Sequence, residues 1–372
     1  MDLQKVNSHL PGPFLTILTL ALLIVFAASA DAAVKRIYWS SGNTGGTMCP
    51  GQIPDSDGII QIANGDGSGL ATLVTGLDRP VGIDLDITQH RIYWIDWDDD
   101  VIGRADLDGS NVVINIFPTP SSGAGATGIA LDTEAQKIYA SSFWKSFDLA
   151  RWNYDGNPDG SVVTMPCATD LALDLNGDHV YWASAYSSCA PGIWRADLSG
   201  TDSNVTPLVN MTGWMIKDEQ VLARDVALDI ANNKMYWTAF PSGWEFCDEG
   251  YGVIYSANLD GSNVQTLVSD IDFPWGIALD LDDGKMYWAD IIEGTIRRAD
   301  LDGTDVELIQ SGLPGPRDLA LELGQQDDLI RGGGSGGCFI DTATKGSHVG
   351  LLFCKLILSY SITLFFIAAL LK

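Results

Sequence analysis

The sequence predicts an all-β protein, a six-bladed β-propeller with four strands in each blade. A six-residue word with a central tyrosine recurs six times, at 36–41, 91–96, 137–142, 179–184, 234–239 and 285–290. Successive tyrosines lie 42 to 55 residues apart, which is a period typical of propeller blades. No segment between Lys35 and Leu323 shows a sustained helical period.

The last repeat shows the four predicted strands most clearly. Its segments read WGIALDLDDG (275–284), KMYWADI (285–291), TIRRADLDGTD (295–305) and VELIQSG (306–312). Short runs of alternating apolar and polar residues end at Asp-Gly, where the chain turns tightly with positive φ. Each period therefore supplies one antiparallel four-stranded sheet.

The ends of the repeat region predict how the ring closes. The first copy has no strand of the GIALD type before RIYWSS, and such a strand appears instead as PRDLALELG at 316–324. A C-terminal strand that joins three N-terminal strands completes one blade and leaves no open sheet edge.

The six copies resemble the YWTD, or low-density lipoprotein receptor class B, repeat family, whose members are six-bladed propellers. The family's Thr is present at Thr238 and its Asp at Asp96 and Asp290, whereas Ala140 replaces the Trp of the third copy. The resemblance implies that the motif is architectural and bonds neighbouring sheets together.

The N-terminal region predicts export. Residues 14–29 are an apolar run too short to span a membrane comfortably, and Ala-Asp-Ala at 30–32 supplies small residues for cleavage before Ala33. We expect a signal peptide at 1–32 and the propeller at 33–324.

The C-terminal region predicts an anchor. A glycine-rich linker at 325–347 precedes an apolar segment at 348–372 that is expected to enter a membrane. The stretch GGCFIDTATKGS resembles the CFI-box of bacterial surface proteins, which implies sorting or anchoring, with Cys338 as the candidate residue. A glycolipid-anchor signal, which also has small residues, a spacer and an apolar tail, is the alternative.

Charge and composition exclude some partners. The formal net charge of −27 repels nucleic acid and attracts cations or basic partners. Carboxylates alternate at 280–284 and 300–307 as in a calcium loop, but no complete EF-hand is present. Because Asp-Gly pairs recur in most repeats, we interpret them as turns and expect no cofactor, with calcium bound at one of these turns as the alternative.

No catalytic signature is found, so the chain is predicted not to be an enzyme. It lacks G-x-S-x-G, H-E-x-x-H and a phosphate loop. The alternative is a propeller hydrolase of the lactonase or esterase type, with an axial metal held at the starts of the inner strands. Asp170, Asp225 and Asp318 lie at those starts, beside arginines at 79, 224 and 317 that could pair with them.

Four cysteines of the exported repeat region predict two disulfides. All four fall in connections that share one rim of the ring. Cys167 and Cys189 flank a hairpin of one blade and are paired first, which leaves Cys49 with Cys247.

The same rim is the predicted binding surface for a protein, peptide or glycan partner at the cell surface. Long insertions at 41–58, 211–220 and 241–252 stand on it, while the opposite rim consists of tight hairpins. Aromatic residues on loops above a rigid scaffold favour recognition. The candidate binding residues are Trp97, Trp214, Trp244, Phe246, Tyr251 and Trp275, with Arg79 and Arg317 orienting an acidic group of the partner.

Overall fold

The computed structural model describes residues 34–42, 57–118, 125–142, 148–164, 167–185, 190–199, 204–242 and 250–323. The chain divides into two compact units, Met1–Gly324 and Gln325–Lys372, and every described residue belongs to the first. The predicted signal peptide, linker, Cys338 and apolar tail lie outside the described residues. Among the residues that are described, no helix is both long and apolar enough to cross a membrane.

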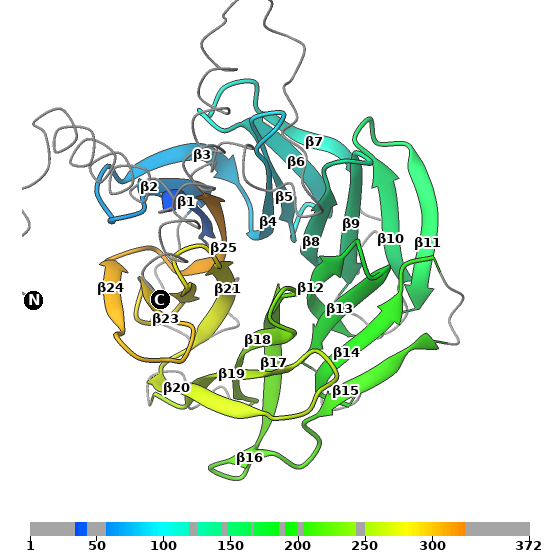
Figure 1. Ribbon diagram of the computed structural model, residues 1–372. Helices are drawn as coiled ribbons and strands as arrows, with labels where there is room; N and C mark the ends of the chain where they lie inside the picture. Colours follow the sequence, from blue (N-terminus) through cyan, green and yellow to red (C-terminus); the bar gives the residue numbers. More distant parts are fainter. Residues whose placement is uncertain are drawn as a thin grey trace, which may run out of the picture. The chain divides into compact units, whose positions relative to one another are not determined.

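The described residues form six antiparallel sheets arranged as a six-bladed β-propeller (Figure 1). Blade 1 contains β25 (Pro316–Leu323), β1 (Val34–Ser41), β2 (Gly58–Asn64) and β3 (Ala71–Leu77). Blade 2 contains β4 (Pro80–Asp86), β5 (Arg91–Asp96), β6 (Val101–Asp106) and β7 (Val113–Pro118). Blade 3 contains β8 (Ala126–Asp132), β9 (Lys137–Ser142), β10 (Asp148–Asn153) and β11 (Pro158–Thr164).

The other half of the ring follows the same order. Blade 4 contains β12 (Ala168–Asp174), β13 (His179–Ser184), β14 (Gly192–Asp197) and β15 (Thr206–Asn210). Blade 5 contains β16 (Met215–Ile216), β17 (Glu219–Asp229), β18 (Lys234–Pro241), β19 (Gly252–Asn258) and β20 (Gln265–Ile271). Blade 6 contains β21 (Pro274–Asp280), β22 (Lys285–Asp290), β23 (Thr295–Asp300) and β24 (Glu307–Gln310).

The ring closes through the C-terminal strand, as the sequence predicts. Strand β25 pairs antiparallel with β1, and Tyr38 lies opposite Ala320. The inner strands β25, β4, β8, β12, β17 and β21 contact one another in this order around the axis. Because both ends of the propeller lie in one sheet, blade 1 links the first and last repeats.

The repeated Tyr-Trp pair fills the contacts between blades. Successive side chains of a strand point to opposite faces, so the Tyr of one blade and the Trp of the next lie in the same interface. Tyr236 and Trp288 share the cluster between blades 5 and 6. Tyr287 and Trp39 share the one that closes the ring. The aromatic pair is therefore core, as the family resemblance implies.

Blade 3 keeps the same packing with the large residue on a different strand. In each of the other blades, a Trp on the second strand and an Ala on the third strand lie in the same cluster. In blade 6 these residues are Trp288 and Ala299. In blade 3, Ala140 stands on the second strand and Trp152 on the third, within one cluster. Both are buried. The missing Trp of the third copy is therefore compensated by a residue of the adjacent strand.

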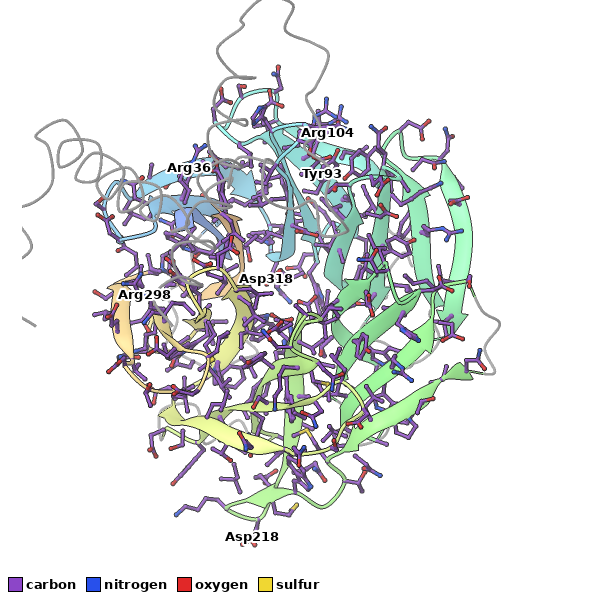
Figure 2. The ribbon with its side chains drawn as sticks, in the orientation of Figure 1. Arg36, Tyr93, Arg104, Asp218, Arg298 and Asp318 are labelled. Carbon is purple, nitrogen blue, oxygen red and sulfur yellow. The ribbon has the colours of Figure 1, made fainter. Side chains whose placement is uncertain are left out.

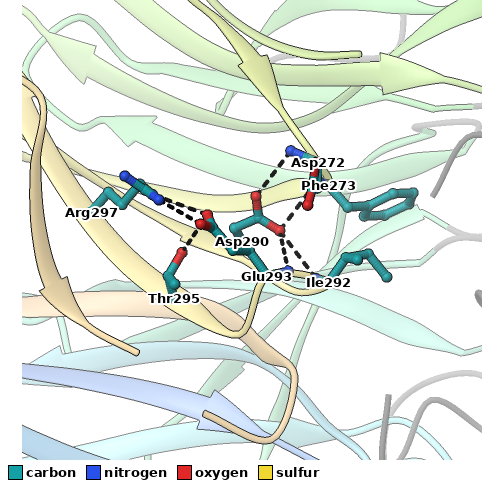
Figure 3. A network of polar contacts seen from close by, with 7 residues as sticks. All are labelled: Asp272, Phe273, Asp290, Ile292, Glu293, Thr295 and Arg297. Atoms are coloured by element: carbon teal, nitrogen blue, oxygen red, sulfur yellow. Dashed lines mark hydrogen bonds and ion pairs between the residues drawn. The ribbon is translucent and has the colours of Figure 1, made fainter. Parts of the chain in front are cut away.

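Polar residues of the motif fix loops and neighbouring blades. Thr238 donates its hydroxyl hydrogen to the carbonyl oxygen of Trp275 in the next blade, at 2.6 Å. The Asp290 carboxylate accepts backbone N–H bonds from Asp272, Phe273, Ile292 and Glu293 (Figure 3). Where they are present, the Thr and Asp of the motif therefore bind backbone groups of the next blade or of a neighbouring loop.

Blade 5 differs from the predicted four strands. Its inner strand β17 has 11 residues, more than any other inner strand, and β16 pairs with Glu219 and Gln220 at its start. Part of the insertion at 211–220, expected to be a loop, is thus a short hairpin. An extended strand exposes backbone donors and acceptors at its edge, and β16 satisfies two residues of that edge.

Candidate functional site

Three aspartates from separate blades meet at the propeller axis. Asp170, Asp225 and Asp318 stand at equivalent positions, the third residue of β12 and of β25 and the seventh of the longer β17. Each offers a carboxylate oxygen within 4.8 Å of the others. Asp318 lies near the middle of the ring (Figure 2). Gly276 occupies this position in β21, and a Cβ atom there would lie 2.9 Å from an Asp318 carboxylate oxygen. Close approach to a neighbouring aspartate therefore requires glycine at 276.

Two of these carboxylates join adjacent blades. Asp225 accepts the N–H of Val226 and, from blade 6, that of Ile277 at 2.6 Å. Asp318 accepts the N–H of Leu319 and, from blade 2, that of Ile83 at 2.7 Å. Buried backbone amides that face the axis have no strand partner there, so the aspartates satisfy them.

The environment of the aspartates favours protonation. Burial raises the pKa of Asp225 to about 6. Burial first, and then repulsion by Asp225, raise the pKa of Asp170 and of Asp318 well above the usual range. Like charges in a dry site cannot all ionise at little cost, so the three groups share protons near neutral pH.

A fourth aspartate belongs to the same axis and was missed in the sequence. Asp84 of β4 stands where the corresponding strands carry alanine, and it accepts the N–H of Leu131 in blade 3 at 2.8 Å. Burial raises its pKa to about 6. The difference between GIDLD in this repeat and GIALD in others was the available signal.

Arginines and Trp275 gather at the loop-bearing end of the axis. The guanidinium carbon of Arg224 lies 3.4 Å from the ring centroid of Trp275, and that of Arg317 lies 5.4 Å away. Both arginines are buried. Burial and the nearby Arg79 and Arg224 lower the pKa of Arg317 to about 9. Cation–π contact with Trp275 offsets part of the cost of placing these charges together.

Two of the predicted binding residues, Trp275 and Arg79, have well-defined contacts. Trp275 is 3% exposed and packs with Phe240, Phe273 and Ile291, so its ring lies beneath the rim. Arg79 forms an ion pair with Asp98 at 2.9 Å and keeps 18% of its side chain exposed. Of these two residues, only Arg79 presents a polar group to a partner.

Of the remaining aromatic candidates, three are partly buried and two lie outside the described residues. Trp97 and Trp214 are partly buried and pack against separate interblade clusters. Tyr251 is also partly buried, and the ammonium of Lys217 lies 5.5 Å from its ring centroid. Trp244 and Phe246 lie outside the described residues. Of the described candidates, Trp97 and Trp214 thus lie in different clusters, Trp97 following blade 2 strand β5 and Trp214 preceding β16 in blade 5.

Cys167 takes part in a disulfide. Every other cysteine of the chain lies outside the described residues. The pairs Cys167–Cys189 and Cys49–Cys247 therefore stay predictions.

The ring of six sheets and its closing strand define a six-bladed propeller, and family comparison identifies its repeats. Residues 90–133 and 284–321 match the family model of the low-density lipoprotein receptor repeat class B. The chain therefore contains class B repeats.

Curated relatives include insect proteins much longer than the matched region. The vitellogenin receptor of Solenopsis invicta is 25% identical over 211 residues, which are 56% of this chain and 10% of the receptor. Protein cueball of Drosophila sechellia is 34% identical over 71 residues, 19% of this chain and 10% of that protein. The chain matches about a tenth of the length of each.

Solved structures show the same fold at low identity. A chain of the nidogen/laminin complex superposes with a TM-score of 0.57 and 15% identity, over 78% of this chain and 99% of that chain. TolB of Acinetobacter baumannii superposes with a TM-score of 0.55 and 13% identity, over 77% of this chain and 66% of TolB. The periplasmic gluconolactonase PpgL of Pseudomonas aeruginosa superposes with a TM-score of 0.51 and 12% identity, over 79% of this chain and 89% of PpgL.

Proposed function

We propose that the protein is an exported, surface-anchored and non-catalytic recognition module that binds a protein partner on the loop-bearing rim. The observation that supports this most is the blade 5 extension, where β16 pairs with β17 and the partly buried Trp214 directly precedes β16. Arg79 and Lys217 add accessible cations on the same rim. Aromatic and basic groups on a rigid support are typical of binding surfaces.

The relatives agree with a protein partner. One relative is named a vitellogenin receptor, and one propeller of the same fold comes from a nidogen/laminin complex. These names describe other proteins, and peptides and glycans are the competing partners in a binding test. Receptor-like relatives also favour a location outside the cell.

The hydrolase alternative fits the axial residues less well. Lactonase-type propellers hold a metal with Glu, Asn and Asp at the starts of the inner strands, whereas the axial acids described here are all aspartates. Asp225 and Asp318 each use both carboxylate oxygens to bind backbone amides of two blades. Asp225 and Asp318 therefore connect neighbouring blades through these hydrogen bonds.

Charge reversal at Arg79 together with Trp214→Ala is expected to weaken partner binding by about tenfold or more, as for residues at the centre of an interface. Native surface extract supplies the partner by capture on the immobilised propeller, and surface plasmon resonance measures the affinity. Arg91→Glu on the opposite rim is the matched control and should leave binding unchanged. A folded Arg79→Glu/Trp214→Ala protein with wild-type affinity would place the site elsewhere.

Deletion of 331–372 is expected to release a soluble propeller into the medium or periplasm, because the apolar tail is the proposed anchor. Immunoblots of membrane and soluble fractions measure the distribution. A deletion of 331–347 that keeps the tail is the control and should still fractionate with membranes. If the tailless protein also stays with membranes, the anchor proposal is wrong.

A further inference from the structure

Two asparagines of blade 4 stand in the sequence pattern that accepts N-linked glycans. The pattern is Asn, any residue except proline, then Ser or Thr, and the chain contains it twice, at 204–206 and at 210–212. The two copies bracket β15, which is the outermost strand of its sheet (Figure 1). Because such a glycan is bulky and must stay at the surface, the surroundings of each asparagine decide which one can carry it.

Asn210 has the geometry of an acceptor. Its side chain is exposed at the end of β15, and its Oδ1 accepts the N–H of Thr212 at 2.9 Å. This hydrogen bond forms an Asx turn, which holds the carboxamide by its oxygen. Within the part of the chain that the structure describes, the Asn210 Nδ2 has no hydrogen-bond partner. The nitrogen that a glycan requires is therefore not committed to the fold.

The hydroxyl of the same pattern is also accessible. Thr212 is exposed in the turn that follows β15. Met211, between the two, is buried and donates its N–H to the carbonyl oxygen of Pro191 at 2.9 Å. The buried Met211 anchors the turn, and the two exposed residues on either side of it can be reached together. A transferase that reads both the amide and the hydroxyl needs this arrangement.

Asn204 is engaged by the fold. Its Nδ2 donates to the Asp197 carboxylate. Thr206 lies in β15 and donates its hydroxyl hydrogen to the carbonyl oxygen of Asn204 at 3.3 Å. Pro207 follows and restricts the backbone of Thr206 to extended conformations. The amide and the hydroxyl of this copy are thus both bonded within the protein.

A glycan at Asn210 has room beside β15 and an effect on it. The strand pairs with β14 on one side, so its other edge exposes backbone N–H and C=O groups. Residues 204–216 contain no Asp, Glu, Lys or Arg, whose charged side chains protect many such edges. A bulky, hydrophilic group at the end of β15 protects this edge against pairing with another chain.

We propose that Asn210 carries an N-linked glycan and that Asn204 does not. In the transfer, Nδ2 forms a bond to the anomeric carbon of a glycan that is linked to a lipid diphosphate. The bond from that carbon to the diphosphate oxygen breaks, the lipid diphosphate leaves with the bonding electrons, and Nδ2 gives up one proton to a base of the transferase. The inference rests on the proposed export, because the transferase acts on chains that leave the cytoplasm.

Mass spectrometry of intact glycopeptides tests the assignment on the full chain, purified from the surface of its native host. We expect a glycan mass on Asn210 and an unmodified Asn204. Sequencing of the N-terminus in the same sample reports export separately, because an exported chain is expected to begin at Ala33.

Thr212→Ala is the sharpest variant, because it removes the hydroxyl and keeps the backbone N–H that bonds to Asn210 Oδ1. We expect complete loss of the glycan and a single shift to faster migration on a denaturing gel. Thr212→Ser keeps a hydroxyl and should migrate as the wild type does. Asn204→Gln is the matched control and should also keep the glycan. Melting temperatures show whether each variant is folded.

The outcomes separate this proposal from the proposed export. An exported chain with an unmodified Asn210 would overturn the glycan and leave export standing. A glycan on Asn204 in place of Asn210 would overturn the assignment, as would a Thr212→Ala protein that migrates like the wild type. An uncleaved chain without a glycan would contradict both proposals.

Discussion

Trp288→Ala is expected to lower the free energy of unfolding by about 3–5 kcal/mol, the range for large-to-small substitutions in a core. The side chain is fully buried between blades 5 and 6, beside Tyr236. Its indole nitrogen has no hydrogen-bond partner among the described residues, so the loss is one of packing. Urea unfolding followed by tryptophan fluorescence and circular dichroism measures the change.

The arrangement of blade 3 supplies a rescue for this substitution. Ala299 and Trp288 face the same interface in blade 6. In blade 3 the two residue types are exchanged, because Ala140 stands on the second strand and Trp152 on the third. Trp288→Ala combined with Ala299→Trp should therefore unfold within about 1.5 kcal/mol of the wild type, since the swap conserves volume. Ala299→Trp alone overfills the interface and is expected to destabilise by about 1–3 kcal/mol. A double variant no more stable than Trp288→Ala would contradict the exchange.

Stability is expected to fall as pH rises from about 4 to about 7. The folded-state pKa of Asp84 and of Asp225 is about 6, raised from an ordinary 3.8 by burial. Across this window the folded chain holds protons that the unfolded chain has released, so the unfolding free energy decreases with pH. A shift of this size corresponds to about 3 kcal/mol for one such site. Urea midpoints at pH 4.5, 6 and 8 measure it.

Asp170→Asn is the variant that tests the origin of this pH dependence. It removes one of three mutually repelling acids and keeps an acceptor for the Leu171 N–H. The variant should be more stable than the wild type at pH 8 and should show a flatter profile. Asp302→Asn, on an exposed hairpin, should retain the wild-type profile. A steep profile in Asp170→Asn would exclude the axial acids as its cause.

Several features of the fold were predictable because they depend on local pattern. The six copies of one sequence motif predict six blades. The alternation of side chains along KMYWAD puts Tyr287 and Trp288 on opposite faces of the strand. The displaced strand at 316–324 identified the closing pair, which the structure has as β25 with β1. The third copy lacked its Trp, yet its substitute was not recognised, because Trp152 lies on another strand of the same face.

The candidate sites were less predictable because they combine residues far apart in sequence. Sequence reasoning identified Asp170, Asp225 and Asp318 at the starts of the inner strands. In the structure, one carboxylate oxygen of each lies within 4.8 Å of the others. Sequence reasoning placed Trp275 on the binding rim, but the stacking of Arg224 over its buried ring required the positions of two blades.

The sequence alone determined the class of this protein, its closed ring and its repeated core, because each depends on a periodicity of side chains that every blade repeats. Only the tertiary structure decided what lies on the axis. There, aspartates from three of the six inner strands meet, and the protonation of their carboxyl groups depends on distances between blades. The sequence places an aspartate in each of these three strands. Closure of the ring brings their carboxyl groups together and so raises their pKa values.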